Sequence, residues 1–125
     1  MAASTTAMSI TGDIKISPGK LGMVGRDYPL TIVRDIGVQY LKDAGKIVDV
    51  AKPTGARFYK TKIPARTKLV NSNTICGGRK DANWLLVVTQ NGHSLSLAFF
   101  SGDREPILAA ASESTELCAT FGYFR

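Results

Sequence analysis

The sequence predicts a mainly β protein: a small antiparallel β-barrel or sandwich of about seven or eight short strands, with one short helix near residues 35–44. Two observations predict this class. Most apolar stretches are short, and Gly, Pro, Asn or Asp residues separate them, which is typical of strands joined by turns. In addition, two apolar runs flank Asn91-Gly92 within residues 84–100, and Asn-Gly is the strongest short signal for a β-hairpin.

A two-residue type I′ turn at Asn91-Gly92 sets the expected register of this hairpin. Gln90 then faces His93, and three apolar pairs share one face of the hairpin: Val88–Leu95, Leu86–Leu97 and Trp84–Phe99. The opposite face is smaller and more polar. Because side chains alternate between the faces of a strand, we expect Trp84 and Phe99 to point into the same core.

The other elements follow from alternation, helical spacing and turn residues. The segment 35–44 has apolar residues at helical spacing, with Asp35 as N-cap and Gly45 as its end. Segment 107–117 fits either a strand followed by a loop or a short helix. Pro29 suggests an edge strand or the start of a strand. Further strands are expected at 9–17, 28–34, 46–51, 56–63, 67–70 and 117–125.

The expected organisation is a disordered or tag-like N-terminus over residues 1–8, followed by one β-rich domain over 9–125. The N-terminal stretch is rich in Ala, Ser and Thr, and it has neither a basic region nor a long apolar run. It is therefore not an intact signal peptide. The longest apolar runs, of about five residues, are too short to span a bilayer.

The two cysteines, Cys76 and Cys118, are 42 positions apart. That spacing does not suit a metal site, and the single His93 cannot complete one. The cysteines are either bonded or two buried thiols, and we favour the disulfide. It would constrain the unfolded chain by about 4 kcal/mol. A disulfide indicates an oxidising compartment, so a periplasmic or secreted location is expected.

Positive charge is concentrated in one segment of a chain whose net charge is +6. Residues 51–80 contain no Asp or Glu. Such asymmetry favours an anionic partner, although a merely solvated surface would show it too. The eight basic residues of this segment are Lys52, Arg57, Lys60, Lys62, Arg66, Lys68, Arg79 and Lys80.

No pattern in the sequence indicates a catalytic site, a metal or a cofactor. His93 is expected at the exposed hairpin tip, whereas a histidine that acts in general acid–base catalysis must be buried or paired in a cleft. The acidic residues are scattered, and the segment Cys76–Lys80 lacks the strand-to-helix setting of a phosphate loop. The sequence therefore predicts a protein that is not an enzyme.

The preferred interpretation is an exported, non-catalytic β domain that binds an anionic macromolecule or a protein partner through the basic segment 51–80. An alternative is a single-stranded nucleic-acid-binding barrel, because Phe58 and Tyr59 lie among the basic residues. A third possibility is a small-ligand binder that uses a barrel interior. The candidate binding residues are Arg57, Tyr59, Lys60, Lys62, Arg66 and Lys68.

Two short pieces, "TGARFY" at 54–59 and "LC" at 117–118, resemble parts of the bacterial inhibitors of C-type lysozyme. Those inhibitors are small exported β-barrels with a Ser-Gly-rich, tyrosine-bearing loop. The resemblance implies a periplasmic inhibitor that inserts a loop, 53–57 or 71–81, into a hydrolase. The match covers only these pieces, and Thr54 stands where a serine is expected. The basic charge also suits a cationic lysozyme poorly.

Overall fold

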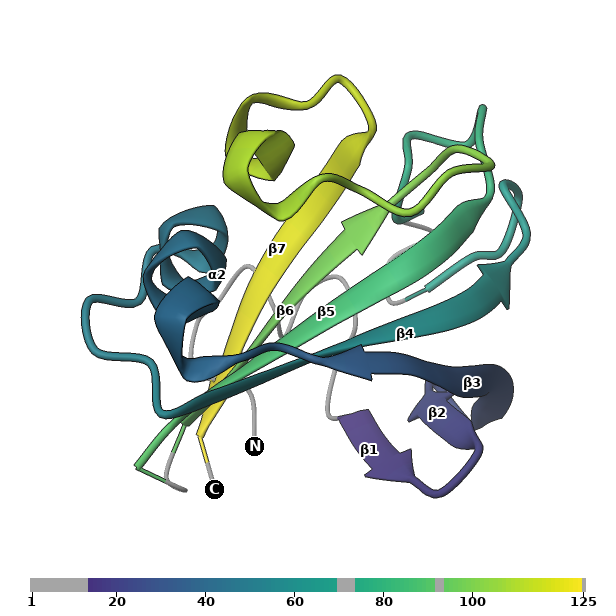
Figure 1. The fold of residues 1–125 in the computed structure, drawn as a ribbon. Helices are drawn as coiled ribbons and strands as arrows, with labels where there is room; N and C mark the ends of the chain where they lie inside the picture. Colours follow the sequence, from purple (N-terminus) through teal and green to yellow (C-terminus); the bar gives the residue numbers. More distant parts are fainter. Residues whose placement is uncertain (1–13, 70–73, 92–93, 125) are drawn as a thin grey trace.

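The computed structural model describes residues 14–69, 74–91 and 94–124, and Figure 1 shows their fold. Seven antiparallel strands form one curled, half-barrel sheet in which each strand pairs with the next one in the sequence. The mainly β class is therefore confirmed. The strands are β1 (Ile14–Ser17), β2 (Lys20–Met23), β3 (Arg26–Asp35), β4 (Gly55–Ile63), β5 (Ala82–Gln90), β6 (Ser94–Phe100) and β7 (Leu117–Phe124).

On one face of the sheet, here called the inner face, side chains from distant strands pack against one another. Leu21 and Met23 of β2 share one buried cluster with Phe99 of β6 and Phe121 of β7. These strands are far apart in the strand order, so the sheet must curl towards this face for their side chains to meet. Leu69 and Ile75, from the segment between β4 and β5, complete the cluster.

The opposite face, here called the helix face, is covered by two helical segments. A 3₁₀ turn, η1 (Val38–Tyr40), leads into α2 (Leu41–Val48), and a second 3₁₀ segment, η3 (Leu108–Glu113), precedes β7. Figure 1 shows α2 and the yellow-green coil of η3 over this face, and the two segments contact each other. The helix-face cluster comprises Ile36, Ala44, Ile47, Phe58, Trp84, Leu86, Val88, Ala98, Phe100, Leu108 and Ala111.

The register of the β5–β6 hairpin differs by one residue from the predicted one. Gln90 pairs with Ser94, so three residues connect the strands where two were expected. Trp84 pairs with Phe100, and Leu85 pairs with Phe99. The prediction that Trp84 and Phe99 share one core is therefore wrong: Trp84 lies on the helix face and Phe99 on the inner face.

The physical reason is that both faces of β5 are covered. Residues 84–88 are all buried, so shifting the register by one moves apolar side chains from one core to another core. Burial specifies register strongly only where one face is solvated. Asn91 does adopt the positive φ of +52° that a turn requires, while the expected position of His93 lies outside the described residues.

The helix lies further along the chain than predicted. α2 ends where Asp49 adopts the left-handed conformation, and the Val50 N–H donates to the Gly45 carbonyl at 2.8 Å. The predicted strand over 46–51 is therefore wrong, because Ile47 faces the helix-face core as part of α2. Gly45 permits this close return of the chain, since a Cβ there would lie 2.4 Å from the Val50 carbonyl oxygen.

Three smaller differences concern the strands. β2 was not predicted, and residues 67–69 form no strand, whereas β4 ends at Ile63 as the following proline suggested. Pro29 lies inside β3 rather than at its start. Pro29 is tolerated there because it lies where β3 changes partner. Residues 26–29 pair with β2, and pairing with β4 begins at Leu30. The predicted disorder of residues 1–8 lies outside the described residues.

Among the described residues, no helix is long and apolar enough to cross a membrane.

Candidate anion-binding surface

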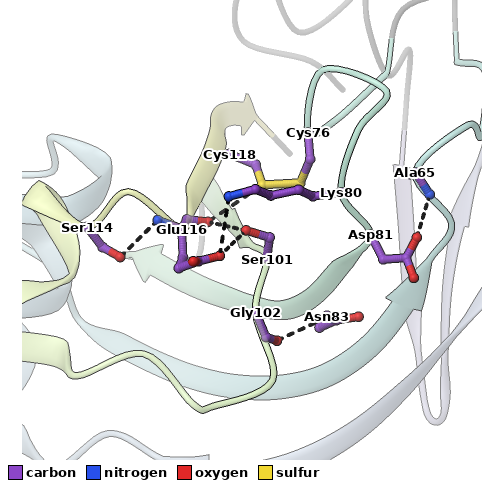
Figure 2. The surroundings of a disulfide bond; sticks show 10 residues. All are labelled: Ala65, Cys76, Lys80, Asp81, Asn83, Ser101, Gly102, Ser114, Glu116 and Cys118. Carbon is purple, nitrogen blue, oxygen red and sulfur yellow. Dashed lines mark hydrogen bonds and ion pairs between the residues drawn. A yellow bond between two sulfur atoms is a disulfide. The ribbon is translucent and has the colours of Figure 1, made fainter.

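A disulfide joins Cys76 to Cys118, as the sequence predicted, with the two sulfur atoms 2.05 Å apart and the two Cα atoms 4.8 Å apart. Cys118 belongs to β7, and Cys76 belongs to the segment between β4 and β5 (Figure 2). The bond therefore fixes this segment, which carries much of the positive charge, to the last strand of the sheet.

Polar contacts next to the disulfide hold the end of β6 against the start of β7. The Ser101 hydroxyl donates to the Glu116 carboxylate, and the Ser101 N–H donates to the Glu116 carbonyl at 2.8 Å. Ser101 is buried. The Lys80 ammonium lies 3.9 Å from the same carboxylate (Figure 2). Glu116 thus links the basic segment to the sheet a second time.

Asp81 closes the base of the same segment. Its carboxylate accepts a hydrogen bond from the Ala65 N–H at 2.7 Å and pairs with the Lys62 ammonium. These contacts bring the two ends of the segment together (Figure 2). The hydrogen bond from Lys62, and then that from Ala65, lowers the pKa of Asp81 below its ordinary value of 3.8.

Replacing Asp81 with Asn tests this closure. Because the folded-state pKa is lowered, the Asp81 charge stabilises the fold above the ordinary pKa and loses that effect as the pH falls through the folded-state value. We expect Asp81→Asn to lower the melting temperature at pH 7 and to lower it less at pH 3. The asparagine oxygen can still accept the Ala65 N–H, so the comparison isolates the charge. Equal losses at both pH values in a thermal-unfolding series would contradict this prediction.

Five exposed cations lie at the end of β4 and on the segment between β4 and β5 that the disulfide holds. We call these five residues the basic end: Lys62, Arg66, Lys68, Arg79 and Lys80. Lys62 pairs with Asp81, and Lys80 makes the long contact with Glu116. Within residues 14–69, 74–91 and 94–124, Arg66, Lys68 and Arg79 take part in no ion pair. In the part of the chain that the structure describes, no carboxylate therefore neutralises these three positive charges.

Lys60 and Phe58 lie on the helix-face side of β4. The Lys60 ammonium stands 5.9 Å from the centre of the Trp84 ring, a distance at which a cation is attracted to the aromatic face. Phe58 is fully buried in the helix-face cluster. The phenylalanine that the sequence placed among the cations is therefore not available to a ligand.

Arg57 and Tyr59 are not part of the basic end. Both side chains line the inner face of the sheet, where Arg57 pairs with Asp35 at the end of β3. Hydrogen bonding to Asp35, and then to Tyr59, raises the pKa of Arg57. Five residues of extended strand separate Arg57 from Lys62, or about 17 Å. The six predicted binding residues therefore fall into three places. Lys62, Arg66 and Lys68 gather at one end, Lys60 lies on the helix-face side against Trp84, and Arg57 and Tyr59 line the inner face.

The basic end can bind anions by charge and by hydrogen bonding, since Arg and Lys side chains donate and do not accept. Among the described residues, no group of three or more His, Cys, Asp or Glu side chains is placed to hold a metal ion. The sequence had pointed to the segment through its charge. It had not indicated Glu116 and Asp81, whose roles depend on contacts between distant parts of the chain.

No protein-family model, curated protein or solved structure matches this chain.

Proposed function

We propose that the protein is a non-catalytic, exported binding domain that recognises an anionic macromolecule through its basic end. The observation that supports this most directly is that Arg66, Lys68 and Arg79 make no ion pair among the described residues, on a segment fixed by a disulfide. Clustered positive charge raises the rate of encounter with a polyanion. A pre-organised segment also loses less conformational entropy when it binds.

An exported location is supported by the disulfide, because such bonds persist in oxidising compartments. The bond links two parts of the chain that carry no other covalent constraint, and it holds the basic segment to β7. Reduction in a cytosolic environment would remove the covalent link between that segment and β7. The proposed binding surface and the proposed compartment therefore depend on the same bond.

Two of the alternative functions have less support. A single-stranded nucleic-acid binder needs exposed aromatic rings beside its cations, whereas Phe58 is buried and Tyr59 lies on the inner face. A hydrolase inhibitor would present segment 53–57 or 71–81 to its target. A basic end formed by Arg66, Lys68 and Arg79 would repel a cationic enzyme.

Charge reversal at the basic end tests the proposal, with heparin as the polyanionic probe. The variant Arg66→Glu/Lys68→Glu/Arg79→Glu should bind heparin about 100-fold more weakly at low salt, because each contact becomes repulsive. The salt dependence of the remaining binding should also become shallower, since fewer counterions are released. Calorimetric titration at two salt concentrations measures both effects.

The matched control is Lys42→Glu/Lys46→Glu/Arg104→Glu. These three cations are exposed, and reversing them also brings the net charge from +6 to 0. We expect this control to keep most of the affinity, because its changed charges lie around the helices. Equal losses in the two triple variants would show that heparin responds only to net charge. That result, or a lack of heparin binding by the wild type, would overturn the proposal.

A further inference from the structure

A cavity of about 670 Å³ lies on the inner face of the sheet, between β1 and strands β4–β7. Its volume is in the range of pockets that hold small organic molecules. The apolar part of its lining includes Ile14 and Ile16 from β1, Val87 from β5 and Leu95 from β6. These residues come from opposite ends of the strand order, so the cavity is a product of the curl of the sheet.

Polar groups also line the cavity. Arg57 supplies one positive charge, and Asp35 supplies one negative charge. The Nε–H of Arg57 donates to Asp35, but a guanidinium carries five N–H groups, so donors remain for a further acceptor. Tyr59 and Thr89 add hydroxyl groups to the lining. The remaining N–H donors of Arg57 therefore lie beside an apolar surface.

We propose that this cavity binds a small amphipathic anion, with its apolar body against Ile16, Val87 and Leu95 and its carboxylate at Arg57. An apolar surface with a few placed polar groups is the usual composition of a small-molecule site. An Arg–carboxylate contact fixes the orientation of such a ligand. The site is separate from the basic end, about 17 Å away along β4, so the two proposals stand independently.

Decanoate and decanol are the probes that test this site on the full chain. They have the same number of carbon atoms and differ in charge, so the difference in their affinities reports the contribution of the carboxylate. We expect decanoate to bind more tightly than decanol. In ¹H–¹⁵N and methyl NMR titrations, both should perturb Ile14, Ile16, Val87 and Leu95 first.

Arg57→Gln should weaken decanoate binding by about tenfold, the effect of losing a hydrogen bond to a charged group, and leave decanol unchanged. Arg34→Gln is the matched control. Arg34 also pairs with a carboxylate, Glu105, and its side chain is 44% exposed against 42% for Arg57. It lies by Phe58 of the helix-face cluster, so its loss should alter neither affinity.

Ile16→Trp should weaken both probes, because the larger ring occupies the apolar part of the cavity. The proposal is overturned if decanol binds as tightly as decanoate, or if perturbations centre on the basic end. It is also overturned if Arg57→Gln and Arg34→Gln weaken decanoate equally.

Discussion

Removing the disulfide with Cys76→Ala/Cys118→Ala should lower the free energy of unfolding by about 4 kcal/mol. The bond spans 42 positions, so it removes considerable loop-closure entropy from the unfolded chain. For a domain of this size, that loss corresponds to a decrease of roughly 15 °C in melting temperature. Thermal and urea unfolding, monitored by circular dichroism, measure the change.

Reduced wild type serves as the control for the substitution itself. Wild type in a strong reductant and the double alanine variant should unfold at similar temperatures, since both lack the cross-link. Adding the reductant to the double variant should have no further effect. A wild type whose melting temperature does not respond to reduction would contradict the assigned role of the bond.

Phe99→Ala should destabilise the protein by about 3–5 kcal/mol, the usual cost of truncating a buried phenylalanine. Phe99 is fully buried on the inner face, and its ring centre lies 6.0 Å from that of Phe121 in an edge-on arrangement. Urea unfolding measures the loss. Phe99→Leu is the milder control, because it keeps most of the apolar volume.

A double-mutant cycle then tests the observed register directly. Phe99→Leu and Phe121→Leu should be coupled by about 0.5–1.5 kcal/mol, as expected for an aromatic pair. Phe99→Leu and Trp84→Phe should be additive, because these two rings lie in separate clusters on opposite faces. Strong coupling between Trp84 and Phe99 would instead support a two-residue turn at Asn91-Gly92.

The fold class was predictable because it depends on local signals. Turn residues such as Pro18-Gly19 and strand ends such as Ile63-Pro64 act within a few positions of the chain. The register of β5 was not predictable in the same way. The rule that selects a register compares an apolar face with a polar one, and in β5 both faces are apolar and buried.

The location of the candidate site was partly predictable. The charge of residues 51–80 is a property of the sequence, and the cations of the basic end lie within this range. The separation of the predicted binding residues into different places was not predictable. It depends on β4, which runs from Arg57 on the inner face towards Lys62 at the basic end. The cavity was not predictable either, since Ile16, Asp35 and Leu95 meet only after the sheet has curled.

The two-sided burial of β5 has a consequence for the unfolded chain. Between Asp81 and Asp103 there is no Asp, Glu, Lys or Arg, and this stretch contains the run Trp84–Val88 and the pair Phe99-Phe100. An uncharged apolar stretch of this kind has the composition of aggregation-prone segments. In the native protein α2 and η3 cover one side of it and the curled sheet covers the other. The packing of α2, η3 and the curled sheet against β5 and β6 therefore also protects the protein from self-association. Variants that weaken this packing on either face should precipitate before they lose their secondary structure.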